Sequence, residues 1–294
     1  MSRAAALSLV FLLSMAVALG VVLATYGVHH AAGAKGYIVL EFDDGYVEMI
    51  TKAAPILKRY GLKASLMIPA GFISPDEAHR RYFYDLDLRH GRRMSFFPTL
   101  SLGEVKRLIE EYGWDVQCHS YTHPYLPAFN LSHPIERRNF LQEIDASRRI
   151  LEEWFGVRVI ACTPPYLGLT PEQHELLKKR FVFIVTHGVF TSDPDRAVNS
   201  IFTDPSSRQN LAAFLLGHGN FRKGVELLKR LLPELRHRSG VVVILMHRVH
   251  EDPRAWDITP QELEELCRLI VELGLRDHVV TYSELADIVV GAAG

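Results

Sequence analysis

Short apolar stretches alternate with amphipathic ones along most of the chain from residue 37 onward. An apolar run of four to eight residues is typical of a buried strand, and apolar positions three or four residues apart are typical of a helix. The clearest strand candidates are residues 37–42, 63–69, 114–118, 157–162, 181–186 and 241–246, with weaker candidates at 197–203 and 278–281. Strands that alternate with helices indicate a parallel sheet.

Several of the expected helices carry start and stop signals. Ser101 followed by Glu104 is typical of a capping box. Pro171 and Pro260 each follow a threonine, which suits the first position of a helix. Glycines that suit a left-handed residue after a helix end stand at positions 61, 113, 156 and 274.

The pattern as a whole predicts an α/β fold. Residues 241–246 are continuously apolar, which indicates a strand buried on both faces. Seven or eight strand–helix units over about 255 residues suit a closed or nearly closed (β/α) barrel of about seven parallel strands. An open, doubly wound sheet is the alternative, but no glycine-rich phosphate loop follows the first strand.

The N-terminus has a different character. No charged residue occurs from position 4 to position 28, and this length suits a membrane-spanning helix. We therefore expect a transmembrane signal anchor or a signal peptide at 1–28, a linker at 29–36 and the main domain at 37–294. Residues HHAAGA could supply a cleavage site, and a buried core helix is a third interpretation. The first two interpretations place the main domain outside the cytoplasm, either anchored to the membrane or secreted after cleavage.

Composition narrows the classes of partner. The 294 residues are 48% hydrophobic and 23% charged, with a formal charge of −1, which is ordinary for a globular protein. Because phosphate binding needs a clustered basic surface, nucleic acid is not an expected partner. Cys118, Cys162 and Cys267 provide neither a disulfide framework nor the spacing of a zinc site.

Polar side chains follow four of the expected strands. Asp-Asp-Gly follows the first strand at 43–45, two histidines follow the third, Thr-Pro-Pro-Tyr follows the fourth at 163–166, and His247 follows 241–246. Asp-Asp-Gly alone is also typical of a plain turn. However, the carboxyl ends of barrel strands meet at one face, where catalytic groups gather. We therefore expect these side chains to share one site.

The two histidines, His119 and His123, suit a metal. A lone pair at this spacing often has no function, but Pro124 disfavours helical geometry and places the pair on a turn. Two imidazoles and one carboxylate would make a three-ligand site of the kind that catalytic zinc uses. One aspartate of the pair at 43–44 could then hold the metal while the other accepts a proton.

Three motifs in this order resemble a known family: FDDG at 42–45, HSYTHP at 119–124 and ILMH at 244–247. Together they are similar to the polysaccharide deacetylases of carbohydrate esterase family four, which include chitin and peptidoglycan deacetylases. The resemblance covers about residues 37 to 290. It implies a distorted (β/α) barrel and the metal-dependent removal of acetyl groups from N-acetylated sugars.

The resemblance also implies roles for individual residues. Asp44, His119 and His123 would be the metal ligands, Asp43 the catalytic base and His247 the general acid. Imidazole and carboxylate ligands suit several divalent ions, of which we expect Zn²⁺ first and Co²⁺ or Ni²⁺ as alternatives.

The substrate would meet residues of the last two motifs. The resemblance implies that Leu245 lines the pocket for the acetyl methyl group. It also implies that the backbone N–H of Tyr166, beside Pro165, helps to stabilise the oxyanion.

The chain departs from the family at two places. Many members carry an arginine that orients the base, and here that position is Thr163. An aspartate with a nearby tryptophan, which supports the acid histidine in the family, has no clear match, and Asp193 or Asp195 could replace it. His187 should also face the mouth of the barrel, where we interpret it as a rim residue.

Two further features have open interpretations. Residues 71–99 form a long connection whose aromatic side chains could stack on sugar rings or pack the segment onto the barrel. Cys118 and Cys162 each precede a site residue, and because side chains alternate along a strand they should point away from the metal. We expect them to be buried thiols rather than a disulfide.

The expected function is thus metal-dependent N-deacetylation of a glycan outside the cytoplasm. A hydrolase of another amide or ester is one alternative. A barrel that binds glycan without turnover is the other, and the two missing family elements favour it.

Overall fold

The computed structural model describes residues 36–87, 93–189 and 207–291. The predicted anchor at 1–28, the linker up to residue 35 and the weak strand candidate at 197–203 lie outside these residues. Within these ranges no helix is long and apolar enough to cross a membrane.

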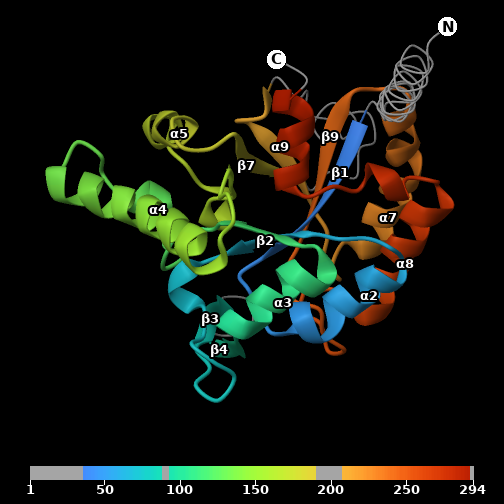
Figure 1. Cartoon of the computed structure of the whole chain (residues 1–294), viewed down its shortest axis with the longest axis horizontal. Helices are drawn as coiled ribbons and strands as arrows, with labels where there is room; N and C mark the ends of the chain where they lie inside the picture. The colour runs from blue at the N-terminus through green and yellow to red at the C-terminus, as the bar shows by residue number, and fades with distance from the viewer. Residues whose placement is uncertain (1–35, 88–92, 190–206, 292–294) are drawn as a thin grey trace, which may run out of the picture. The chain divides into compact units, whose positions relative to one another are not determined.

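Seven parallel strands close into a barrel, which confirms the predicted fold class (Figure 1). The strands follow one another around the barrel in chain order, and β9 returns to pair with β1. Their bounds are β1 Gly36–Asp43, β2 Ser65–Ile68, β5 Asp115–Cys118, β6 Ala161–Cys162, β7 Phe183–Val189, β8 Leu211–Leu215 and β9 Gly240–Met246.

Pairing between neighbouring strands is uneven, so the barrel is distorted. β1 and β9 pair over seven residues, from Gly36 opposite Gly240 to Phe42 opposite Met246. By contrast, β5 and β6 pair only at Cys118 and Cys162. This single pair lies directly before His119 and Thr163. The chain therefore leaves the sheet after Cys118 and Cys162 and forms loops over the barrel mouth.

Side chains alternate along each strand between two apolar layers. Val39 of β1 points into the barrel with Val243 and Leu245 of β9, whereas Leu40 and Phe42 pack outward against the surrounding helices. All five of these side chains are buried. Because Glu41 and Asp43 share the inward face with Val39, β1 carries two carboxyl groups into the barrel.

Helices surround the barrel, and α2, α3 and α8 lie side by side on one flank (Figure 1). The predicted capping box is confirmed at Ser101, and Pro171 and Pro260 begin helices as expected. Thr170 and Thr259 also form capping boxes, which were not predicted. The glycines at 61, 113, 156 and 274 have positive φ, as expected. The α-helices are α2 Ala54–Arg59, α3 Leu102–Tyr112, α4 Pro134–Phe155, α5 Pro171–Lys178, α7 Phe221–Leu231, α8 Pro260–Glu272 and α9 Tyr282–Gly291.

The long connection at 71–99 is a β-hairpin and not an unstructured loop. Its strands, β3 Tyr82–Asp87 and β4 Arg93–Pro98, pair antiparallel. Phe83 and Phe97 are buried and both contact the ring of Tyr46, at centroid distances of 5.6 Å. In contrast, Tyr82 and Phe96 are exposed. The hairpin therefore both packs onto the barrel and presents aromatic rings to solvent.

Three expectations about strands were wrong. β8 was missed, because LAAFLL at 211–216 is a short apolar run that periodicity does not distinguish from a helix. Residues 278–281 contribute one isolated bridge, Ile38 to Val279, and no strand. Of residues 157–162 only Ala161–Cys162 is a strand, since Gln117 accepts hydrogen bonds from the N–H groups of Ile160 and Ala161.

Candidate active site

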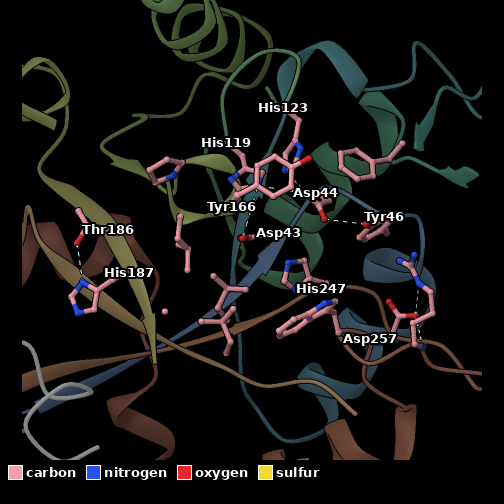
Figure 2. A pocket seen from close by; sticks show the side chains of 18 residues that line it. Asp43, Asp44, Tyr46, His119, His123, Tyr166, Thr186, His187, His247 and Asp257 are labelled. Atoms are coloured by element: carbon pink, nitrogen blue, oxygen red, sulfur yellow. Dashed lines mark hydrogen bonds and ion pairs between the residues drawn. The ribbon is translucent and has the colours of Figure 1, made fainter. Parts of the chain in front are cut away.

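A pocket of about 530 Å³ opens at the carboxyl ends of the strands. Its volume is ordinary for a small-molecule site. Figure 2 shows side chains from β1, the loops after β5 and β6, and the end of β9 pointing into it. Among the pocket-lining residues are the predicted site residues Asp43, Asp44, His119, His123, Tyr166, Leu245 and His247.

The chain turns sharply after β1, and this turn aims Asp44 into the pocket. Asp44 and Gly45 both have left-handed backbones, with φ of 76° and 73°. A Cβ atom on Gly45 would lie 2.5 Å from Ile68, so only glycine fits at this position. The Tyr46 hydroxyl donates to Oδ2 of Asp44 at 3.0 Å, which leaves Oδ1 facing the histidines.

The loop after β5 carries both histidines. Nδ1 of His119 donates to the carbonyl of Thr163 at 2.5 Å, because a carbonyl can only accept. This bond fixes the tautomer in which Nε2 is free of a proton. Burial also lowers the pKa of His119, which keeps its imidazole neutral. His119 is therefore held in the form that can ligate a metal.

Asp44, His119 and His123 form a three-ligand cluster. Oδ1 of Asp44 lies 3.5 Å from Nε2 of His119 and 3.2 Å from Nε2 of His123. One ligand atom from each residue lies within 4.8 Å of the others. Burial alone would raise the pKa of Asp44, but the two imidazoles outweigh it and hold the pKa well below its usual range. A buried, ionised carboxylate facing two imidazoles fits a divalent cation.

Asp43 has the opposite electrostatic surroundings. Burial raises its pKa well above the usual range, and the negative charges of Glu41 and Asp44 raise it further. Its Oδ2 is 3.9 Å from Nε2 of His119, so it lies beside the ligand cluster. Two neighbouring carboxyl groups with displaced pKa values in opposite directions are typical of an acid–base site.

The loop after β6 is strained where it meets the pocket. Tyr166 and Leu167 have φ of 60° and 54°. Strain of this kind costs of order 1–3 kcal/mol per residue and clusters at functional sites. It leaves the Tyr166 ring 66% exposed at the pocket mouth. Pro164 lines the pocket, whereas Pro165 is buried and is not on the wall.

His247 follows β9 and lines the pocket together with Trp256 and Asp257. Figure 2 labels His247 and Asp257 among the lining side chains. Asp257 is 1% exposed and accepts a hydrogen bond from Arg248 at 2.7 Å. This Trp-Asp pair was not predicted. A tryptophan beside an aspartate within ten residues of His247 was the available signal in the sequence.

The sequence of residues 30–180, more than half of the chain, matches the family described as polysaccharide deacetylase. The chain belongs to this family.

Solved structures of polysaccharide deacetylases and related esterases are similar to this family member at low identity. The Xyl-CE4 domain of a multidomain xylanase from the hindgut metagenome of Trinervitermes trinervoides is 17% identical, with a TM-score of 0.49 over 86% of this chain and 90% of that chain. Peptidoglycan deacetylase PdaC from Bacillus subtilis is 18% identical, with a TM-score of 0.49 over 86% and 91%. A family 4 carbohydrate esterase from Streptomyces lividans in complex with acetate is 14% identical, with a TM-score of 0.44 over 85% and 93%. No curated protein matches the sequence.

In this polysaccharide deacetylase family member, Thr163 has a partner inside the barrel. Its hydroxyl donates to Oε1 of Glu41 at 2.8 Å, and the Tyr282 hydroxyl donates to Oε2 at 2.5 Å. All three side chains are fully buried or nearly so. The position at which many family members have an arginine thus contacts a carboxyl group next to Asp43.

The remaining expectations have different outcomes. Asp193 and Asp195 lie outside the described residues. His187 is exposed and lines the pocket, as expected of a rim residue. Cys118 and Cys162 are free thiols in the apolar layer outside the barrel, with Sγ of Cys118 3.7 Å from the Ser147 hydroxyl of α4.

Proposed function

We propose that this chain is a metal-dependent hydrolase that removes N-acetyl groups from an N-acetylated glycan outside the cytoplasm. One observation carries the proposal: the ligand set Asp44, His119 and His123 shares a pocket with a second buried carboxyl group, Asp43, and with His247. Family membership supports a glycan as the substrate. The uncharged segment at 4–28 supports the location.

A divalent cation would be held by Oδ1 of Asp44 and Nε2 of the two histidines. Bound there, such a cation would polarise an amide carbonyl and lower the pKa of a bound water molecule. Two hydrogen bonds orient two of the three ligands. The Tyr46 hydroxyl donates to Oδ2 of Asp44, and Nδ1 of His119 donates to the carbonyl of Thr163. Zn²⁺ is the proposed ion, and Co²⁺ or Ni²⁺ would suit the same ligands.

Asp43 would be the general base. Burial and the charges of Glu41 and Asp44 raise its pKa in the absence of a cation. The positive charge of a bound cation would keep the Asp43 carboxylate ionised, so that it could accept a proton. It would take the proton from the attacking water.

The other groups would act on the substrate. His247 would donate a proton to the departing amine. The backbone N–H of Tyr166 would donate to the oxyanion. Leu245 is buried on the inward face of β9 and lines the pocket, so its side chain offers an apolar wall for the acetyl methyl group.

Aromatic rings at the pocket mouth suit the faces of sugar rings. Tyr166 is 66% exposed and lies 4.9 Å from the His123 ring, while Trp256 is 41% exposed. Both line the pocket, so a sugar in the pocket would lie close to one or both rings. Tyr125, which is also exposed, extends this surface outward at 6.1 Å from Tyr166.

Acetate release tests this proposal. The full chain, purified in detergent, is incubated with N-acetylated oligosaccharides in the presence of zinc and again after chelation, beside Asp43→Asn. We expect chelation to abolish release and Asp43→Asn to reduce kcat by about 10²–10⁴-fold. The variant should still bind zinc, because Asp43 is not one of the three ligands.

Other outcomes would change the assignment. Zinc binding without acetate from any glycan would favour a different amide or ester substrate. Glycan binding without zinc binding or acetate release would favour the barrel that binds without turnover.

A further inference from the structure

The turn that carries the two histidine ligand candidates, His119 and His123, is strained. Ser120 and His123 have left-handed backbones, with φ of 64° and 58°. For residues other than glycine such conformations cost of order 1–3 kcal/mol each, and they persist only where surrounding contacts hold them. Surrounding contacts must therefore hold residues 119–123 in a backbone conformation that the isolated segment would not keep.

One of these contacts comes from Glu143, in the middle of α4. Its Oε2 accepts the backbone N–H groups of Tyr121 and Thr122, at 3.0 and 2.7 Å, and its Oε1 accepts the Thr122 hydroxyl at 2.7 Å. One carboxylate therefore satisfies three donors from the two residues that lie between Ser120 and His123. Hydrogen bonds to an ionised acceptor are roughly twice as strong as those between neutral groups.

The helix that carries Glu143 is itself fixed to the barrel. Phe140, Ile144 and Ser147 of α4 are buried, and Ser147 contacts Cys118 of β5 at 3.7 Å. Glu143 and Ser147 are four residues apart and so lie on one face of the helix. This face places the carboxylate against the turn and the hydroxyl against the strand that precedes it.

The opposite flank of the turn is bonded to the segment after β2. The N–H groups of Ala70 and Gly71 donate to the carbonyls of Ser120 and Tyr121. Within the turn, the Ser120 hydroxyl accepts the N–H of His123 at 3.0 Å. The turn is thus held through its carbonyls on one side and through its N–H groups by Glu143 on the other.

We propose that Glu143 is a positioning residue for the metal site, which holds the turn so that His119 and His123 converge on Asp44. The inference rests on the proposed metal site but not on the identity of the substrate. Glu143 itself contacts neither the cation nor the substrate. Removing it should weaken metal binding, because the histidines must then be ordered when the metal binds.

Zinc affinity tests the inference directly. The full chain is freed of metal, and its affinity for Zn²⁺ is measured by competition with a chromogenic chelator. We expect Glu143→Ala to weaken affinity by about 10–100-fold, as is typical when an outer partner of a ligand is lost. Glu143→Gln keeps one acceptor oxygen, so we expect a smaller loss of about three- to tenfold.

Glu153→Ala is the matched control, since Glu153 lies on the same helix and is exposed beside Arg149. It should leave zinc affinity unchanged. The metal-free unfolding temperature of each variant is measured as well, because a merely structural role would lower this temperature without reducing the further rise that zinc produces.

Three results would overturn the inference: zinc affinity of Glu143→Ala within twofold of the parent, an equal loss in Glu153→Ala, or no zinc binding by the parent. If Glu143→Ala does not fold, Glu143→Gln decides, and unchanged affinity overturns the inference. Zinc binding by the parent without acetate release would count against the proposed function and leave this inference intact.

Discussion

Glu41 shows how a single residue changes the electrostatics of the site. It precedes Asp43 on the inward face of β1 and receives hydrogen bonds from Thr163 and Tyr282. Burial raises the pKa of Glu41 to about 7, although these hydrogen bonds oppose the rise. The charge of Glu41 in turn raises the pKa of Asp43. The folded chain therefore binds a proton at this carboxyl pair more strongly than the unfolded chain does.

Glu41→Gln should change how the free energy of unfolding depends on pH. Between pH of about 4.5 and 7 the unfolded chain releases the Glu41 proton and the folded chain keeps it, so parent stability falls as pH rises. The variant lacks this contribution. We expect its stability relative to the parent to increase across that window and then to level off, as measured by urea unfolding of the metal-free chain at pH 5, 6, 7 and 8.

All other titratable groups are the same in both proteins, so the difference between the two curves isolates the acidic pair. If the substitution only altered hydrogen bonding, the free energy of unfolding of the variant would be lower by the same amount at every pH. The slope of its curve against pH would then equal that of the parent. Parallel curves from pH 5 to pH 8 would contradict the assigned pKa of Glu41.

At the scale of elements, the loops at the strand ends hold every non-glycine residue with a positive φ among the described residues. The non-glycine residues with positive φ are Asp44, Ser120, His123, Tyr166 and Leu167. They occupy three loops, which follow β1, β5 and β6. Rigid strands and helices thus support short loops in uncommon conformations, and these loops present the reactive groups.

Gly45→Ala should disrupt the first of these loops. The left-handed backbone costs alanine about 1 kcal/mol, and the clash with Ile68 adds about 1–3 kcal/mol of overpacking. We expect a loss of about 2–4 kcal/mol in the free energy of unfolding, measured with urea. Gly113→Ala is the control, because Gly113 has the same backbone conformation but no neighbouring atom within 4 Å of the place that a Cβ would take. It should lose only about 1 kcal/mol, and an equal loss in both variants would contradict the clash.

Tyr125→Ala should weaken the binding of longer substrates. Tyr125 is exposed and lies 6.1 Å from the Tyr166 ring, but it is not among the pocket-lining residues. We therefore expect it to contact a second sugar ring and not the first. An aromatic contact of about 0.5–1.5 kcal/mol corresponds to a two- to tenfold rise in KM for an oligosaccharide. A short acetylated substrate should be unaffected. Trp154→Ala, at an exposed aromatic residue of α4, is the control, and equal effects on short and long substrates would contradict this role.

The sequence was sufficient for elements with strong local signals and insufficient where contacts distant in the chain decide. Ser101 was identifiable as a helix cap, because a cap depends on residues three positions apart. Asp44, His119 and His123 could be grouped because the carboxyl ends of parallel strands meet. By contrast, the contacts of Glu143 with the turn after β5 depend on how α4 folds back onto the barrel. No local spacing encodes that.

At the scale of the whole molecule, the segment at 1–35 distinguishes the two proposed locations. We expect the full chain to sediment with membranes and to resist a high-salt wash, because residues 4–28 carry no charge. Fractionation with mass spectrometry of the N-terminus measures this. A soluble chain that lacks its first residues would show cleavage of a signal peptide, and a soluble full-length chain would contradict both expectations.

The pairing of β1 with β9 has a consequence for synthesis. Gly36 to Phe42 pair with Gly240 to Met246. The first barrel strand to be synthesised therefore pairs with the last one. Contacts so distant in sequence slow folding, because a long loop must close before they form. Until residue 246 has left the ribosome, β1 and β8 both present unpaired edges that can join other chains. We therefore expect the nascent chain to need protection by chaperones until β9 is made, and a product truncated before residue 240 to aggregate.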